Sequence, residues 1–207
     1  IENERYEIFF GDGIFGKKLE EGNFITANYI TCNGDSANGI NQFAIQLPIV
    51  RGYDKELIVS KVLKQYDIIS PRHKYVRFYI NGQYVGIRDV EEVVSRDLIE
   101  ANKRRYGPIF DIDWSDSDTY YRSKFSLRDP KYWNNNSSSL HSQTLYVLEK
   151  IKTSPDTLPR FFDEKRWGIY MAIMDGFQTF HGSEPSSVKY FLNPVLGKIE
   201  PVFWDGH

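Results

Sequence analysis

Residues 75–87, YVRFYINGQYVGI, form two runs of alternating apolar and polar side chains that are joined by Asn81-Gly82. Alternation with a period of two is typical of β-strands, and Asn-Gly tolerates the positive φ angles of a tight type I′ turn. The stretch therefore predicts a β-hairpin. The other strand-like runs also occur as hairpins rather than alternating with helices. We therefore expect an α+β fold with a mostly antiparallel sheet and flanking helices.

Two stretches with helical patterns flank this hairpin. Residues 56–69 place apolar side chains on one loose helical face, and Pro71 ends that pattern. Residues 95–105 begin with a serine, which is a common helix cap, and end with basic residues that suit the last turn of a helix. We therefore expect one helix before the hairpin and another after it, the second terminated by Gly107-Pro108.

The C-terminal half predicts two longer helices and a second hairpin. Apolar residues recur on one face of residues 139–152, whereas residues 162–177 are mostly apolar and are expected to form a buried helix. Two strand-like runs, 188–193 and 198–205, are separated by a short turn. The polar stretch 111–139 is expected to be a long irregular connection.

Composition limits the classes of function. The chain has 207 residues, 41% of them apolar, and a formal net charge of −2. This charge gives no general attraction to nucleic acid or to anionic membranes, and no apolar run approaches the thickness of a bilayer. We therefore expect no nucleic-acid partner and no membrane partner. Cys32 is the only cysteine, which excludes an intramolecular disulfide and a cysteine-based zinc site.

A glycine pattern near the N-terminus resembles a phosphate-binding loop. Gly11, Gly13 and Gly16 form G-x-G-x-x-G directly after a strand-like run. A dinucleotide-binding fold needs a helix at the third glycine, but only KKLEE precedes Gly22. A kinase glycine loop needs a lysine on the next strand, and NFITANYI contains none. We therefore interpret these glycines as turn residues of a hairpin that binds no nucleotide.

The segment that contains these glycines resembles a known family. The stretch YEIFFGDGIFGKKLEEGNFITANYITCNGDSANGINQF is similar to a segment of baseplate wedge proteins from contractile-tailed phages. The resemblance covers about residues 5–43 and implies a structural role in assembly. We therefore expect residues 1–46 to form a separate, glycine-rich β segment.

A second resemblance covers about residues 55–207. Four ordered pieces, SPRHKYVRFYINGQYVGIRDVEE, NKRRYGPI, YMAIMDGFQTFHG and YFLNPVLGKIEPVFWD, resemble the CotH-type atypical kinases related to spore-coat protein H. The resemblance implies transfer of a phosphoryl group from ATP, with Mg²⁺, to a Ser or Thr hydroxyl of a protein partner. Residues 47–207 would form this domain. Because the chain ends just after a strand-like run, we expect it to be a fragment truncated at the C-terminus.

The resemblance proposes roles for individual residues. Asp205 ends an apolar strand, where a rigid carboxylate can hold the metal ion, and Asp175 matches the Asp-Gly of the family and suits the catalytic base. His181 matches a histidine of the family and joins the catalytic set. Without the resemblance, both aspartates are better explained as turn or helix-end residues beside glycine, and His181 as a hydrogen-bonded core histidine.

Further roles concern the metal ion and the phosphates. Ser187 stands where the family has an asparagine as second metal ligand. Glu91 or Glu92 would orient a phosphate-binding cation, as a helix glutamate does in ordinary kinases, although the pair also suits a solvated helix start. Where the family carries a basic residue, this chain has Asp111, so Lys189 is the candidate substitute cation.

Two other functions remain open at this point. The chain would be a non-catalytic structural protein, either a kinase-like scaffold or a baseplate component, if the departures from the family pattern abolish catalysis. One such departure is His207, which stands in place of a second acid. A metal-dependent hydrolase built from Asp113, Asp116 and Asp118 is less favoured, because DIDWSDSD lacks the glycine and the glutamate of a calcium loop.

Overall fold

The chain forms two antiparallel sheets with helices packed mainly around one of them. The computed structural model describes residues 5–10, 13–18, 28–31, 39–80, 82–113 and 124–206. The strands are β1 (Arg5–Phe10), β2 (Gly13–Lys18), β3 (Asn28–Thr31), β4 (Gln42–Gln46), β5 (His73–Ile80), β6 (Gln83–Glu92), β7 (Ile109–Asp113), β8 (Lys124–Leu127), β9 (Lys189–Asn193) and β10 (Lys198–Val202). The helices are η1 (Pro48–Arg51), α1 (Lys55–Gln65), α2 (Arg96–Ala101), α3 (Pro130–Asn136), α4 (Ser138–Thr153), η2 (Pro155–Thr157), α5 (Leu158–Phe161), α6 (Glu164–Gly176) and α7 (Phe180–Ser183).

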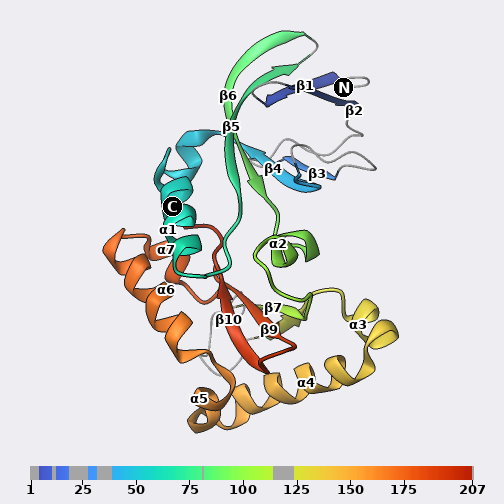
Figure 1. Cartoon of the computed structure of the whole chain (residues 1–207), viewed down its shortest axis with the longest axis vertical. Coiled ribbons are helices and arrows are strands. Elements are labelled where there is room, and N and C mark those ends of the chain that lie inside the picture. The colour runs from blue at the N-terminus through green and yellow to red at the C-terminus, as the bar shows by residue number, and fades with distance from the viewer. Residues whose placement is uncertain are drawn as a thin grey trace.

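The six-stranded sheet, which we call the upper lobe, has the strand order β2-β1-β5-β6-β4-β3 (Figure 1). Its centre is the predicted hairpin, in which Val76 pairs with Arg88 and Ile80 with Gln83. Gly82 has a φ of 79°, as a tight turn requires, whereas Asn81 lies outside the described residues. The hairpin prediction is therefore confirmed.

Strands from the N-terminal segment complete this sheet. β1 pairs with β5 and β4 pairs with β6, so residues on both sides of the expected boundary near residue 46 share one sheet. Division into a 1–46 segment and a 47–207 domain stays a prediction. β1 and β2 form an antiparallel pair around the glycine pattern, with Gly13 and Gly16 in β2 and Gly11 outside the described residues.

The four-stranded sheet, with the order β10-β9-β7-β8, and helices α3 to α7 form what we call the lower lobe (Figure 1). Its main core is built from buried side chains of the sheet, of α4 and of α6. Val59 and Leu63 of α1 pack into this same core, whereas Leu98 and Ile99 of α2 pack in a neighbouring cluster with Phe191. α1 and α2 therefore attach the upper sheet to the lower lobe.

The sequence predictions for fold class, for the two C-terminal helices and for the second hairpin are confirmed. The expectation that residues 111–139 form an irregular connection is wrong, because β8, α3 and the start of α4 lie within it. Trp133 explains the difference: its buried ring contacts Tyr106 with centroids 4.9 Å apart and anchors α3 to the lower lobe. A single aromatic anchor in a polar stretch produces no periodic pattern.

Two helices differ from their expected form. α2 ends at Ala101 without basic residues in its last turn, since Lys103 adopts a left-handed φ of 60°. Arg104 turns inward instead, and its Nη2 lies 2.9 Å from Oε2 of the buried Glu200. α6 is buried only at Tyr170 and Met174, so it packs one face on the core and is not enclosed as its mostly apolar sequence predicted. Within the described residues, no helix has the length and apolar character that crossing a membrane requires.

A substitution at Gly107, which lies between α2 and β7, tests how closely the lower lobe is packed. A Cβ atom there would lie 2.5 Å from the carbonyl oxygen of Leu192 and 2.6 Å from Cδ of Pro194. We expect Gly107→Ala to lower the free energy of unfolding by about 1–3 kcal/mol, because the backbone must shift.

The matched control is Gly168→Ala inside α6, where an added Cβ meets nothing within 4 Å. This substitution should raise the free energy of unfolding by about 0.5–1 kcal/mol, because alanine favours a helix interior. Urea denaturation followed by circular dichroism measures both effects. Equal stabilities of the two variants would contradict the close contact at Gly107.

Candidate functional site

Arg51 lies buried where the two lobes meet. It ends η1, and the guanidinium contacts three carboxylates from distant parts of the chain. Nη2 lies 3.0 Å from Oε2 of Glu91 on β6, and Nε lies 3.4 Å from Oε2 of Glu56 in the first turn of α1. Nη1 contacts Oδ1 of Asp205, which follows β10. Arg51 therefore joins the upper sheet, α1 and the C-terminal strand.

Further hydrogen bonds hold the same carboxylates. The backbone N–H of Gly206 donates to Oε1 of Glu56 at 2.5 Å, and Nε2 of Gln46 donates to Oε2 of Glu91 at 2.6 Å. Both glutamates are buried, with 1% of their surface exposed. Buried carboxylates with several donors are fixed in position, so the site is rigid rather than solvated.

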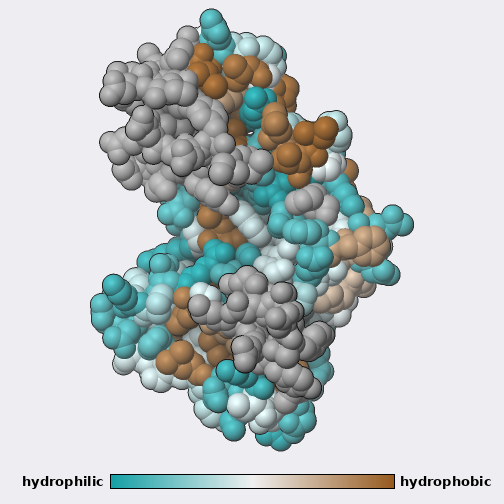
Figure 2. Space-filling view, turned by 180° about the vertical axis from the view of Figure 1, so that it is seen from behind, coloured by the Kyte–Doolittle hydropathy of each residue, from teal (hydrophilic) through white to brown (hydrophobic). Residues whose placement is uncertain are grey.

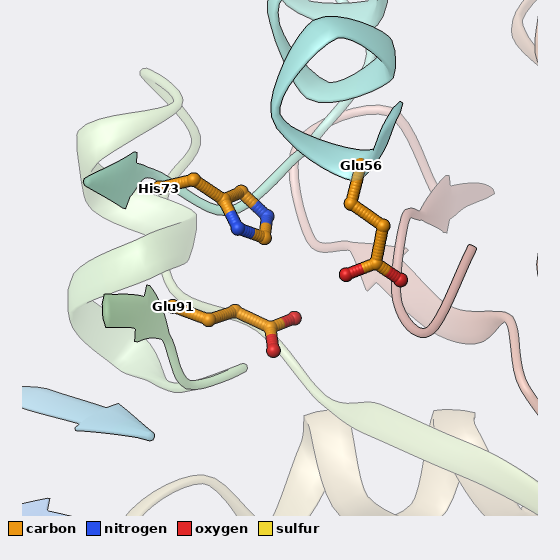
Figure 3. Close-up of side chains that lie close together, drawn as sticks. All are labelled: Glu56, His73 and Glu91. Carbon is orange, nitrogen blue, oxygen red and sulfur yellow. The ribbon is translucent and has the colours of Figure 1, made fainter. Parts of the chain in front are cut away.

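His73 lies beside the two glutamates, at the start of β5 (Figure 3). Its Nδ1 is 2.9 Å from Oδ2 of Asp89 on β6. Burial opposes a charge on the imidazole, but the hydrogen bond to Asp89 and the charges of Glu91, Asp89 and Glu56 together raise the pKa of His73. Burial raises the pKa of Glu91 to about 7, against the opposing charges of His73 and Arg51. Burial likewise raises the pKa of Glu56.

Asp205 has an unusual backbone conformation. Its φ is 58°, in the left-handed region, which aspartate tolerates better than most residues and which is enriched at functional sites. The next residue must be small, because a Cβ at Gly206 would lie 2.3 Å from the ring of Phe203. The segment after β10 therefore has no room for a larger residue at position 206, and the Asp205 carboxylate lies beside Arg51.

His181 and Ser187 lie next to this carboxylate. Nδ1 of His181 is 3.2 Å from Oδ2 of Asp205 and 3.1 Å from its carbonyl oxygen. Oγ of Ser187 lies 3.2 Å from the same nitrogen. Because Nδ1 faces oxygens of Asp205, it is the ring nitrogen that carries a proton.

The structure thus brings together four of the residues expected from the sequence. Asp205, His181 and Ser187 are in contact, and Glu91 reaches them through Arg51. The ion pair between Glu91 and Arg51 has the geometry that a cation-orienting glutamate requires.

Three expected residues lie apart from this group. Glu92 faces the opposite side of β6 and pairs with Arg72, whose Nε is 2.8 Å from Oε2. Lys189 forms an ion pair with Asp111 at 3.0 Å, and Asp175 is exposed in the last turn of α6. Within the described residues, neither Lys189 nor Asp175 contacts Asp205.

Sequence reasoning missed Arg51, Glu56 and His73. Arg51 follows an apolar stretch that matches no motif, and an acidic residue in the first turn of a helix is ordinarily a solvated one. One pattern carried information: Asp89 and Glu91 alternate along a single strand and so share one face of the sheet. Two acids on one buried face require a cationic partner.

Of the acids proposed for a hydrolase, Asp113 lies at the end of β7, whereas Asp116 and Asp118 fall outside the described residues.

The comparisons do not place the chain in a family. No protein-family model matches it, and no curated protein does.

Replacing Arg51 by methionine should destabilise the protein strongly. The change leaves Glu56, Glu91 and Asp205 buried or half-buried without their guanidinium, and breaking a buried ion pair on one side typically costs about 3–5 kcal/mol. Chemical denaturation of the variant measures the loss.

Arg96→Met is the matched control, because Arg96 forms an exposed pair with Glu100 on α2. Exposed pairs contribute little to stability, so this variant should unfold like the unmodified chain. If both arginine variants lost the same stability, Arg51 would not be the buried link between the lobes.

Proposed function

We propose that the chain is a kinase-like domain of the spore-coat protein H type. It would transfer a phosphoryl group from ATP, with Mg²⁺, to a Ser or Thr hydroxyl of a protein partner. The observation that carries the proposal is the position of Arg51, held by Glu56 and Glu91 beside the carboxylate of Asp205. A cation fixed by glutamate next to a metal-binding aspartate is the arrangement that phosphoryl transfer uses.

Arg51 would be the phosphate-binding cation, the role predicted from the sequence for Lys189. A guanidinium presents several N–H donors in a planar fork, which matches phosphate oxygens in two-point contacts. The two glutamates hold the fork in place, so little side-chain entropy is lost when a phosphate binds. Lys189 instead neutralises Asp111 in the lower sheet.

The donor atoms near Asp205 fit Mg²⁺. Asp205 and Ser187 offer a carboxylate and a hydroxyl oxygen, both within 3.2 Å of the same nitrogen of His181. Mg²⁺ prefers oxygen ligands and commonly uses one or two protein groups together with phosphate oxygens. Asp205 and Ser187 would hold the ion, and it would neutralise phosphate charge. His181 would position Asp205 by donating from Nδ1, and the Ser187 hydroxyl lies beside the same nitrogen.

Asp175 would act as the base that accepts the proton of the substrate hydroxyl. It is exposed and therefore accessible to a protein substrate. The end of its helix lies against the start of α1, since Nζ of Lys55 donates to the carbonyl oxygen of Gln178 at 2.8 Å.

ATP with Mg²⁺ should stabilise the chain against thermal unfolding, because a ligand of the folded state raises its melting temperature. At about 100 times its dissociation constant, ATP would add about 2.7 kcal/mol. Asp205→Asn should abolish the Mg²⁺-dependent part of the shift and the transfer of labelled γ-phosphate to a Ser/Thr-containing protein.

The matched control is Asp156→Asn, which removes an exposed carboxylate in η2. With ATP and Mg²⁺, this variant should show the same rise in melting temperature and the same phosphate transfer as the unmodified chain. No nucleotide-dependent shift in any of the three proteins would contradict the kinase proposal.

A structural role is the second candidate, and two observations favour it. β2 and β3 are the edges of the six-stranded sheet, and unpaired strand edges are ready templates for association. β6 also exposes Tyr84, Val85 and Ile87, and apolar side chains are visible on the surface of the upper lobe (Figure 2). A protein partner or further copies of the chain would cover these groups.

Under the structural proposal, the chain should self-associate in a concentration-dependent way without nucleotide. Burial of exposed apolar side chains and strand edges supplies the driving force. Sedimentation velocity of the whole chain over a wide concentration range measures this association. A monomer at every concentration would contradict assembly through copies of this chain.

A further inference from the structure

We propose that Glu56, His73 and Glu91 bind one divalent transition-metal ion between the lobes, with Asp89 orienting the imidazole. This site is separate from the Mg²⁺ position at Asp205, and it does not rest on the proposed kinase function. The three ligands come from α1, β5 and β6, so the ion would join elements that are distant along the chain.

The geometry is the first support. One ligand atom from each residue can be chosen so that all three lie within 4.8 Å of one another, and all three residues are well shielded from solvent. Zinc ligands lie about 2.0–2.2 Å from the ion, so ligand atoms around one ion are at most about 4.4 Å apart. The ligand atoms must therefore move closer together when the ion binds. Figure 3 shows the imidazole and the two carboxylates turned toward one another.

The second support is an unpartnered nitrogen. Only 1% of the His73 side chain is exposed to solvent. Its Nε2 atom has no hydrogen-bond partner within the described part of the chain. A buried polar atom without a partner is costly and requires an explanation. A metal ion bound at Nε2 supplies the missing partner.

The third support is the set of contacts behind the ligands. Nδ1 of His73 bonds to Asp89, which is the carboxylate–histidine pairing that fixes the tautomer of metal-binding histidines. Arg51 and Gln46 both contact Oε2 of Glu91, so Oε1 is the oxygen that would face the ion. Ligating carboxylates are normally supported in this way through their second oxygen.

Charge favours a divalent ion. Glu56, Glu91 and Asp205 contact the single guanidinium of Arg51, and Asp89 contacts His73. Carboxylates therefore outnumber the guanidinium in this group, and a divalent ion would offset the excess negative charge. Buried groups are most stable when their charges are balanced.

The donor set indicates the type of metal. One imidazole nitrogen with two carboxylate oxygens suits Zn²⁺ or Mn²⁺, whereas Mg²⁺ and Ca²⁺ prefer oxygen ligands alone. Zn²⁺ should bind more tightly than Mn²⁺, in accordance with the general order of divalent-metal affinities.

Titration calorimetry with Zn²⁺ and with Mn²⁺, on tag-free chain freed of metal by a chelator, tests the site. The unmodified chain should bind one tight equivalent. His73→Gln should weaken binding more than about 100-fold, and Asp89→Asn about 10–100-fold, as expected when a ligand or its supporting carboxylate is lost. His141→Gln, which removes an imidazole on α4, is the matched control and should bind normally. Unchanged affinity of His73→Gln would overturn the proposal.

A measurement on the unmodified chain covers the case in which His73→Gln does not fold. In ¹⁵N spectra of the four histidine side chains, Zn²⁺ should shift Nε2 of one buried imidazole while its Nδ1 keeps a proton. Absence of such a shift would overturn the proposal.

Asp205→Asn separates this site from the proposed Mg²⁺ position. The variant should still bind Zn²⁺ tightly, because Asp205 is not a ligand of the proposed ion. Loss of Zn²⁺ binding in Asp205→Asn with retention in His73→Gln would place the ion at Asp205 and overturn the proposal. None of these measurements contains nucleotide, so failure of the kinase proposal leaves their outcome unaffected.

Discussion

The guanidinium of Arg51 is buried and contacts carboxylates from α1, from β6 and from the segment after β10. Removing a charge from water is costly unless opposite charges and hydrogen bonds surround it closely. Because the three carboxylates come from separate elements, this requirement fixes the position of α1 relative to the upper sheet and of both relative to the C-terminal strand. The candidate site is therefore a consequence of how one arginine is neutralised.

A second, partly buried network of ion pairs holds the lower lobe in a similar way. The carboxylate of Glu200 on β10 receives hydrogen bonds from Arg104 and from Asn193 at 2.9 and 2.6 Å. Arg104 also contacts Asp67, which follows α1 and in turn binds Arg166 of α6. These contacts sit around the apolar core rather than inside it, and they fix the orientation of elements that apolar packing alone would leave adjustable.

The same side chains serve structure and candidate chemistry. Glu56 and Glu91 stabilise Arg51, and they are also the carboxylates that would face a transition-metal ion. Asp205 is tied to Arg51 and to His181, and its left-handed backbone places the carboxylate between the lobes. Any ion or phosphate that binds here must exchange with existing ion pairs, so binding and the relative position of the lobes are coupled.

The sequence by itself determined the local elements, because their patterns are short-range. Period-two alternation with Asn-Gly produced the hairpin of β5 and β6, helical periodicity produced α4, and a mostly apolar run produced α6. It also placed Asp205, His181 and Ser187 in the C-terminal part of the chain, although the contact between His181 and Asp205, 24 residues apart, depends on the fold.

Only the tertiary structure decided the rest of the site. Arg51 and Asp205 are 154 residues apart, and Glu56 and Gly206 are 150 apart, so no local pattern links them. Trp133 similarly orders α3 through a contact with Tyr106 that the polar sequence around it does not indicate. A charged residue is ordinarily solvated, and it becomes a buried anchor only when distant partners fold around it. That dependence on distant partners is the physical reason why Arg51, Glu56 and His73 emerged only from the folded chain.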